Sequence, residues 1–222
     1  MAKKTASLAD QAYQTIKNKI LDLTYAPGMA LTEAMLTEEL GMSRSPVRSA
    51  IQMLQAEGLL ISDYYRSIRV KEITDKDIHD IYQLRELLEG AAFQLIFTSG
   101  RYEEYSFRIE EKVVRMCACA SDPYAWEVAD TDMHMEILGI LDNERINRIY
   151  ENNLSEQIRI GQYSVRHGMR IPQTNERLKK MIRFMRKGDC ENAYAILRED
   201  HFMLGRDSAL RGQYSKDPED CK

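Results

Sequence analysis

Two short amphipathic helices separated by a glycine turn constrain the fold of this chain more than any other feature. The first helix is predicted from about Thr32, and Gly41 follows it where a left-handed C-terminal cap is favoured. The second is predicted to start at Ser43 or Ser45, since either serine can cap a helix and Pro46 then falls in the first turn, where its missing N–H costs no hydrogen bond. Two helices joined by a turn of three or four residues that contains glycine are typical of a helix-turn-helix.

The second of these helices has two faces of different character. Its apolar stripe consists of Val47, Ala50, Ile51 and Leu54. A separate polar stripe consists of Arg44, Arg48 and Gln52, with Ser45 beside it. A helix that lies in the major groove of DNA presents guanidinium groups and hydroxyls of this kind to base edges and phosphates. A solvated helix face would carry a similar stripe, so the stripe alone does not decide between the two.

The flanking residues favour DNA binding. Apolar residues recur every four positions from Leu8 to Ile20 and predict a preceding helix. After Gly58, two short strands are predicted over about residues 59–61 and 68–71, with a polar tip between them that carries Arg66. Three helices followed by a two-stranded hairpin form a winged helix-turn-helix, which we expect over residues 1–72.

A family resemblance is carried by Pro27-Gly28-x-x-Leu31-x-Glu33 and by Leu40-Gly41-Met42-Ser43-Arg44-Ser45-Pro46-Val47-Arg48. These runs resemble the GntR family of bacterial transcription regulators. The resemblance implies that Arg44, Ser45 and Arg48 contact DNA from the second helix and that Arg66 contacts it from the wing. The family usually has glycine after the wing arginine, where this chain has Ser67, so a close approach of the wing backbone to the minor groove is not implied.

The rest of the chain predicts an all-α helical bundle. Apolar residues three or four apart run from Ile78 to Leu95 and indicate a long amphipathic helix. Five further helices are predicted over about residues 103–120, 124–141, 143–167, 173–187 and 189–210, which makes six. The predicted organisation is a linker at residues 73–77, a bundle at 78–211 and a flexible tail at 212–222.

This second part also carries a resemblance, in Tyr82-x-x-Arg85-x-x-x-Glu89-x-x-Ala92, in Asp130-x-x-x-His134 and in the segment from Gly188-Asp189 to His201. These motifs resemble the ligand-binding domain of the FadR-like branch of the family, called the FCD domain. The resemblance implies an all-helical domain, in its shorter six-helix variant, that binds an effector and dimerises.

Asp130 and His134 are candidates for a metal site. They are four residues apart, so both side chains leave one helix on the same face, and His201 on another helix could complete a set of three ligands. A hydrogen-bonded pair without a metal has the same spacing. In the family resemblance a further histidine ligand is expected where this chain has Arg177, and arginine cannot bind a metal.

Two outcomes therefore remain open for the ligand domain. Zinc, nickel or manganese could bind through Asp130, His134 and His201, or Arg177 could replace the cation and hold an effector carboxylate with its guanidinium. Further effector-binding candidates are Arg85, from its place in the family motif, and Arg159 and Tyr163, from the central helix.

Composition and charge exclude other classes of protein. No apolar run approaches the roughly 18 residues of a membrane span, and the four cysteines include no Cys-x-x-Cys pair, so reduced thiols and a cytoplasmic location are expected. The net charge of −4 argues against a protein that coats nucleic acid. Residues 1–72 have a net charge of +1 and residues 73–222 one of −5, so basic groups are relatively concentrated in the DNA-binding part.

The sequence thus predicts a ligand-responsive transcription regulator, and the family resemblance implies a repressor that binds a palindromic operator as a homodimer and responds to a small carboxylic or sugar acid. One alternative is a metal-dependent hydrolase that uses Asp130, His134 and His201, although no general base lies beside these residues in the sequence and no glycine-rich phosphate loop is present. The other is an architectural DNA-binding protein without an effector.

Overall fold

The chain divides after Ile73 into two units with separate hydrophobic cores. The structure, a computed structural model, describes residues 6–62 and 67–214, without the side chains of Asp200, His201, Gln213 and Tyr214.

Residues with helix-capping properties mark the ends of the helices in the first unit. Helix α1 (Leu8–Leu21) starts with a capping box between Ser7 and Asp10. Helix α2 (Glu33–Leu40) follows Thr32, whose hydroxyl accepts a hydrogen bond of 3.1 Å from the Met35 amide. Gly41 ends α2 with a φ of 62°, in the left-handed region, and α3 (Arg44–Ala56) starts after Ser43. The predicted helix-turn-helix is confirmed.

The sheet of the first unit has three strands among the described residues, one more than the predicted wing hairpin. Strands β2 (Leu60–Ser62) and β3 (Ile68–Val70) pair antiparallel, as expected. On the other side of β3 lies β1 (Ala30–Leu31), which gives the order β1-β3-β2. A two-residue strand is too short to show an alternating pattern, which explains why the sequence did not predict it. Arg66, the predicted wing contact, lies outside the described residues.

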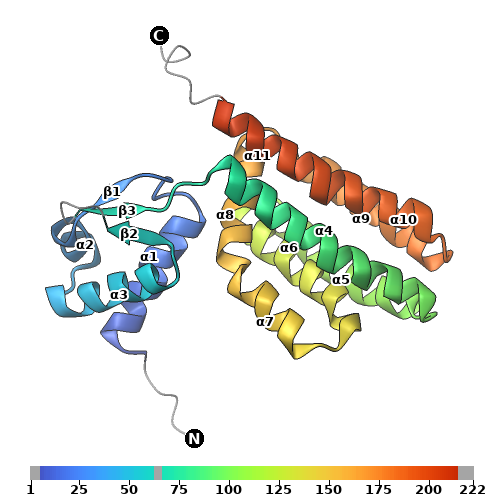
Figure 1. Ribbon diagram of the computed structural model, residues 1–222, viewed down its shortest axis with the longest axis horizontal. Coiled ribbons are helices and arrows are strands. Elements are labelled where there is room, and N and C mark those ends of the chain that lie inside the picture. The colour runs from blue at the N-terminus through green and yellow to red at the C-terminus, as the bar shows by residue number, and fades with distance from the viewer. Residues whose placement is uncertain (1–5, 63–66, 215–222) are drawn as a thin grey trace, which may run out of the picture. The chain divides into compact units, whose positions relative to one another are not determined.

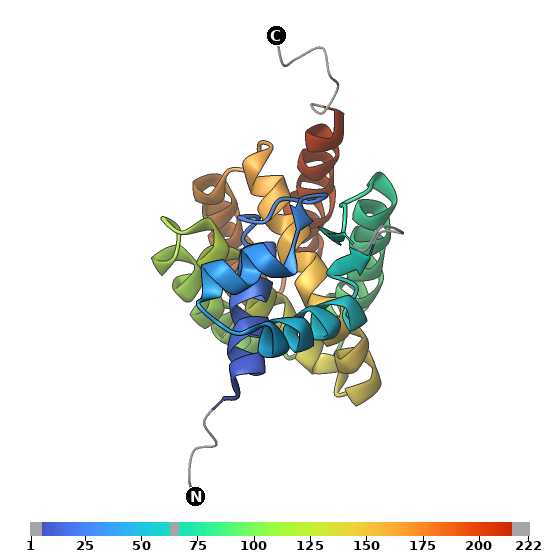
Figure 2. The same cartoon turned by 90° about the vertical axis from the view of Figure 1, so that its left-hand side faces the viewer.

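The core of the first unit anchors α3 by its apolar face. Helix α1 packs against α3 (Figures 1 and 2), and Val47, Ala50 and Leu54 of α3 are each 0% exposed. The remaining buried residues come from α1, α2 and all three strands. The polar face of α3 therefore has a fixed orientation, turned away from this core.

The second unit is all-helical, as predicted. In chain order its elements are α4 (Asp75–Thr98), α5 (Tyr102–Ala118), α6 (Pro123–Leu138), the short 3-10 helix η1 (Gly139–Leu141), α7 (Glu144–Asn152), α8 (Leu154–Arg166), α9 (Ile171–Arg186), α10 (Cys190–Leu197), the π-helical segment η2 (Arg198–Leu204) and α11 (Gly205–Tyr214). Figure 1 shows α4 running alongside the stretch from α10 to α11, and α5 packs against α6 and α9. In the part of the chain that the structure describes, no helix is both long enough and apolar enough to cross a membrane.

Three predicted boundaries in this unit are wrong. The single helix expected over residues 143–167 is two helices, because the chain breaks at Asn153. The side-chain amide of Asn153 donates to the Ile149 carbonyl at 2.7 Å and so competes with the backbone hydrogen bonds of the helix. The predicted count of six helices is therefore too low. The linker expected to reach residue 77 ends earlier, since Thr74 and Asp77 form a capping box and α4 starts at Asp75. Helix α11 continues to Tyr214, into the predicted tail.

Candidate functional site

The exposed face of α3 brings together four of the predicted DNA-binding residues. Arg44, Ser45, Arg48 and Gln52 are all exposed, on the face opposite the buried stripe. The side chain of Ser43 does not cap the helix, so the first amides of α3 are left to other acceptors. Helix N-termini with such amides bind phosphate groups. The face thus combines guanidinium groups, a hydroxyl and an amide in an arrangement that fits DNA.

One of these arginines is engaged with an acidic side chain from α2. The Arg48 Nε donates to Glu33 Oε1 at 3.0 Å and its Nη2 donates to Oε2 at 2.9 Å, a bidentate ion pair. The hydrogen bonds and charge of Arg48 lower the pKa of the Glu33 carboxyl. Both residues line a groove of about 580 Å³ that also includes Gln52, Gln55 and Ser62.

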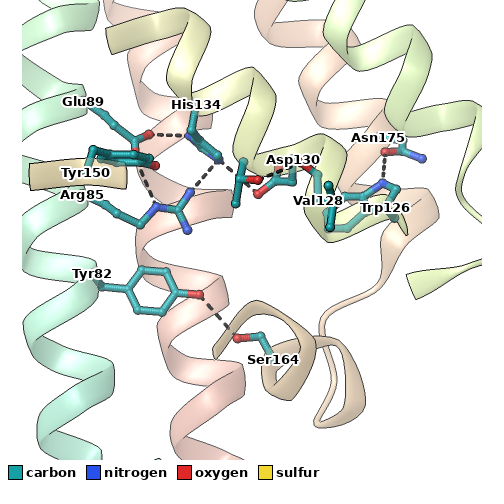
Figure 3. A network of polar contacts seen from close by, with 11 residues as sticks. Tyr82, Arg85, Glu89, Trp126, Val128, Asp130, His134, Tyr150, Ser164 and Asn175 are labelled. Carbon is teal, nitrogen blue, oxygen red and sulfur yellow. Dashed lines mark hydrogen bonds and ion pairs between the residues drawn. The ribbon is translucent and has the colours of Figure 1, made fainter. Parts of the chain in front are cut away.

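A second cluster lies inside the helical unit and joins three helices (Figure 3). Glu89 of α4 accepts hydrogen bonds from Arg85 Nε at 3.0 Å and from the hydroxyl of Tyr150 on α7 at 2.8 Å, and it pairs with Nδ1 of His134 on α6. His134 Nε2 lies 2.6 Å from Arg85 Nη2 and 3.2 Å from Asp130 Oδ2. None of these five side chains is more than 8% exposed. We call them the buried network.

The charges of the buried network stabilise one another. Burial by itself would raise the pKa of Glu89, but the charges of His134 and Arg85 and the hydrogen bonds from His134 and Tyr150 lower it to about 2. Burial and Arg85 lower the pKa of His134, but the carboxylates of Glu89 and Asp130 raise it by more. A guanidinium can only donate, so in the neutral ring His134 Nε2 accepts from Arg85 at 2.6 Å and Nδ1 carries the proton that faces Glu89; the charge that lowers the pKa of Glu89 belongs to the protonated ring. Protonation of Nε2 would instead favour its contact with Asp130.

The described residues of the network do not fit a divalent metal. Asp130 and His134 share a face, as predicted, but both ring nitrogens of His134 already have partners, and the partner of Nε2 is the guanidinium of Arg85. A dication at this nitrogen would have to displace a like charge in a buried environment. No group of three or more possible metal ligands occurs among the described residues, a set that does not include the His201 side chain.

We therefore expect protein purified without added metal or chelator to hold well below one equivalent of zinc, nickel or manganese per chain. Elemental mass spectrometry measures this directly, and a thermal shift assay with each metal chloride is the control. A stoichiometric metal that raises the melting temperature and is lost in an Asp130→Asn variant would contradict this assignment.

Arg177 lies outside the buried network. It is exposed on α9, where the buried residues are Thr174, Asn175 and Leu178. Arg177 lines a surface pocket of about 190 Å³ with Arg170, and its role as a guanidinium that holds an effector carboxylate stays a prediction.

The other predicted effector-binding residues have different surroundings. Arg159 is buried on α8, with 1% of its surface exposed. The Tyr163 hydroxyl donates to the Gly212 carbonyl at 2.8 Å and so attaches α11 to α8. The backbone of His201 lies in η2, and its side chain is outside the described residues.

Sequence reasoning missed three polar groups of the interior. Glu89 was noted only as part of a motif, although its spacing of four from Arg85 indicates an ion pair. Tyr150 carries no local signal, because its partner lies 61 residues away. Glu127 is 3% exposed and packs so closely on α8 that a Cβ added at Gly161 would lie 2.0 Å from its Oε2; burial and the charge of Asp130 raise its pKa well above the usual range.

Comparison with known families matches both units. Residues 8–70 match the model described as bacterial regulatory proteins, gntR family, and residues 80–201, more than half of the chain, match the FCD domain. Members of these families are DNA-binding transcription regulators and not enzymes.

Individual relatives match over part of their length. A helix-turn-helix transcriptional regulator of Bacillus subtilis (strain 168) is 35% identical over 94 residues, 42% of each chain. A protein of Paenarthrobacter nicotinovorans, named as a transcriptional repressor of a D-xylose utilization operon, is 26% identical over 65% of this chain and 64% of its own. The matches thus span between about two fifths and two thirds of these relatives. A GntR transcriptional regulator from Rhodococcus sp. RHA1 has the same fold, with a TM-score of 0.69 at 18% identity over 96% of this chain and 100% of that one.

Proposed function

Because this chain belongs to the GntR family of transcription regulators and carries an FCD domain, we propose that it is a ligand-responsive repressor that reads its operator with α3. The observation that carries this proposal is the exposed face formed by Arg44, Ser45, Arg48 and Gln52 on a helix whose opposite face is fully buried. Arginine forks on such a face recognise guanine edges in the major groove, and the amides at its N-terminus suit a phosphate.

We further propose that the protein binds DNA as a homodimer. A dimer with two-fold symmetry presents two copies of α3, so the operator is expected to be palindromic, with half-sites about one helical turn apart or a multiple of it. Selection of bound fragments from a random-sequence duplex pool tests this. A two-chain mass by light scattering together with an inverted repeat in the selected sequences is the expected result; a one-chain mass and a single asymmetric site would contradict it.

The helical unit is proposed to bind the effector, a small carboxylic or sugar acid. The name of the Paenarthrobacter relative, a repressor of a D-xylose operon, supports an effector of this size and polarity. The buried ionic groups Arg85, Glu89 and His134 also support a polar effector, because they are groups that can bind a charged molecule. An effector that binds better to a conformation unable to hold the operator would shift the protein toward that conformation.

Effector and operator must affect each other equally in this scheme. If an effector weakens operator binding by a given factor, the operator weakens effector binding by the same factor, because the coupling free energy is shared. Thermal shift screening of sugar acids and dicarboxylates identifies the effector, and titration calorimetry with and without operator duplex measures both factors. A compound that binds equally well to the free and the DNA-bound protein would not be the effector.

The two alternatives are less well supported. A hydrolase would need a metal or a general base at Asp130 and His134, whereas His134 pairs with Arg85, Glu89 and Asp130, and the families matched contain regulators. An architectural protein without an effector would be favoured by a wholly apolar interior, whereas Arg85, Glu89 and His134 are buried here.

A further inference from the structure

The ion pair between Glu33 and Arg48 engages one edge of the guanidinium and leaves the other available. The two contacts use the N–H of Nε and one N–H of Nη2. Among the described residues no further partner of Arg48 is seen, so both N–H groups of Nη1 and the second one of Nη2 remain. These are the end-on donors that bind guanine O6 and N7 as a fork.

Glu33 is itself held in place by its position in α2. It is the first residue of this helix, directly after the Thr32 cap, where the helix dipole favours a negative charge. Helix α2 packs against α3, so the carboxylate approaches Arg48 from a fixed direction. The charge and hydrogen bonds of Arg48 lower the pKa of Glu33, which keeps it ionised.

The helix dipole accounts for a modest stabilisation by Glu33 at the start of α2, but not for its bidentate contact with Arg48. The side chains of Arg48 and Glu33 are 60% and 35% exposed, and exposed ion pairs contribute little to folding. A negative charge on a DNA-facing groove also repels phosphates and weakens binding to any duplex. A group that lowers general affinity is consistent with a role in discrimination between sequences.

We propose that Glu33 is a positioning residue that fixes the Arg48 guanidinium with its free edge directed at one base pair of the operator. The proposal rests on the proposed function of the α3 face. Without Glu33 the long side chain of Arg48 would sample several rotamers and contact phosphates as readily as a base. The preference for the operator over other sequences would therefore fall more than the affinity for DNA.

The test uses the full-length protein and two labelled duplexes of equal length, the operator selected from a random pool by the wild-type protein and a scrambled version of it. The measured quantity is the ratio of the two dissociation constants. Glu33→Gln is expected to reduce this ratio roughly three- to tenfold, since ordering of one flexible side chain is lost, while binding to the scrambled duplex stays equal or becomes tighter. Glu33→Asp keeps the charge but is too short for both contacts, and it is expected to reduce the ratio as well.

Glu38→Gln is the matched control. Glu38 is exposed on the same helix, and its substitution removes the same charge. It is expected to tighten binding to both duplexes alike and to leave the ratio unchanged. If Glu33→Gln behaves in this same way, Glu33 is only a general repulsive charge and the proposal is wrong.

A double-mutant cycle separates this proposal from the proposed function. Glu33→Gln should reduce discrimination in the wild-type background and should have no further effect in the Arg48→Ala background, because Glu33 acts through Arg48. An equal reduction in both backgrounds would overturn the positioning role and leave the DNA-binding face intact. If Arg48→Ala does not change discrimination at all, the assignment of Arg48 as a base-reading residue fails, and the role of Glu33 fails with it.

Discussion

Glu89→Ala is expected to lower the free energy of unfolding of the helical unit by about 3–5 kcal/mol, the usual cost of removing one partner from a buried ion pair. Glu89 is 0% exposed and accepts hydrogen bonds from Arg85, His134 and Tyr150. Its removal leaves the guanidinium of Arg85 without its carboxylate in an environment that water does not reach. Chemical denaturation followed by circular dichroism measures the change in the free energy of unfolding.

The control for this substitution is Glu86→Ala on the same helix. The Glu86 side chain is 45% exposed and lies 3.8 Å from Arg198, so its loss is expected to cost less than about 0.5 kcal/mol. Equal stability of the two variants would contradict the buried network as described.

Leu54→Ala is expected to destabilise the first unit by about 2–5 kcal/mol. Leu54 is 0% exposed, and the cavity left by its truncation lies in the small core that anchors α3. Because the two units have separate cores, the unfolding transition of the helical unit should move little. Operator binding should therefore be lost at temperatures at which the helical unit is still folded, as seen by calorimetry and fluorescence anisotropy on the same sample.

Met53→Ala is the neighbouring control. Met53 is 39% exposed, and its truncation is expected to leave the first transition within about 0.5 kcal/mol of the wild type. A single transition that shifts as a whole in Leu54→Ala would show that the two units do not unfold separately.

The local fold could be predicted wherever the signal lies within a few residues. Thr32 and Gly41 mark the ends of α2 by their own chemistry, and the structure places caps at both, whereas Ser43 marks the start of α3 without a side-chain cap. Strand β1 could not be predicted in this way, since its pairing with β3 depends on residues about forty positions away. The break at Asn153 was missed because the apolar pattern continues across it.

The buried network, too, could be predicted from the sequence only where the residues concerned are close together in the chain. The spacing of Asp130 and His134 correctly predicts one helix face, but the groups that contact His134 come from α4, more than forty residues earlier. Whether such a pair binds a metal or a guanidinium depends on that long-range packing and not on its spacing.

Whether α3 reads DNA is tested most directly by the affinity of Arg44→Ala and Arg48→Ala for the selected operator duplex. Arg115→Ala, which removes an exposed arginine of the helical unit, is the control. Each α3 variant is expected to weaken operator binding by about 1–3 kcal/mol in a fluorescence anisotropy titration, and the control is expected to bind as the wild type. Unchanged operator affinity in both α3 variants would contradict the claim that this face of α3 reads DNA.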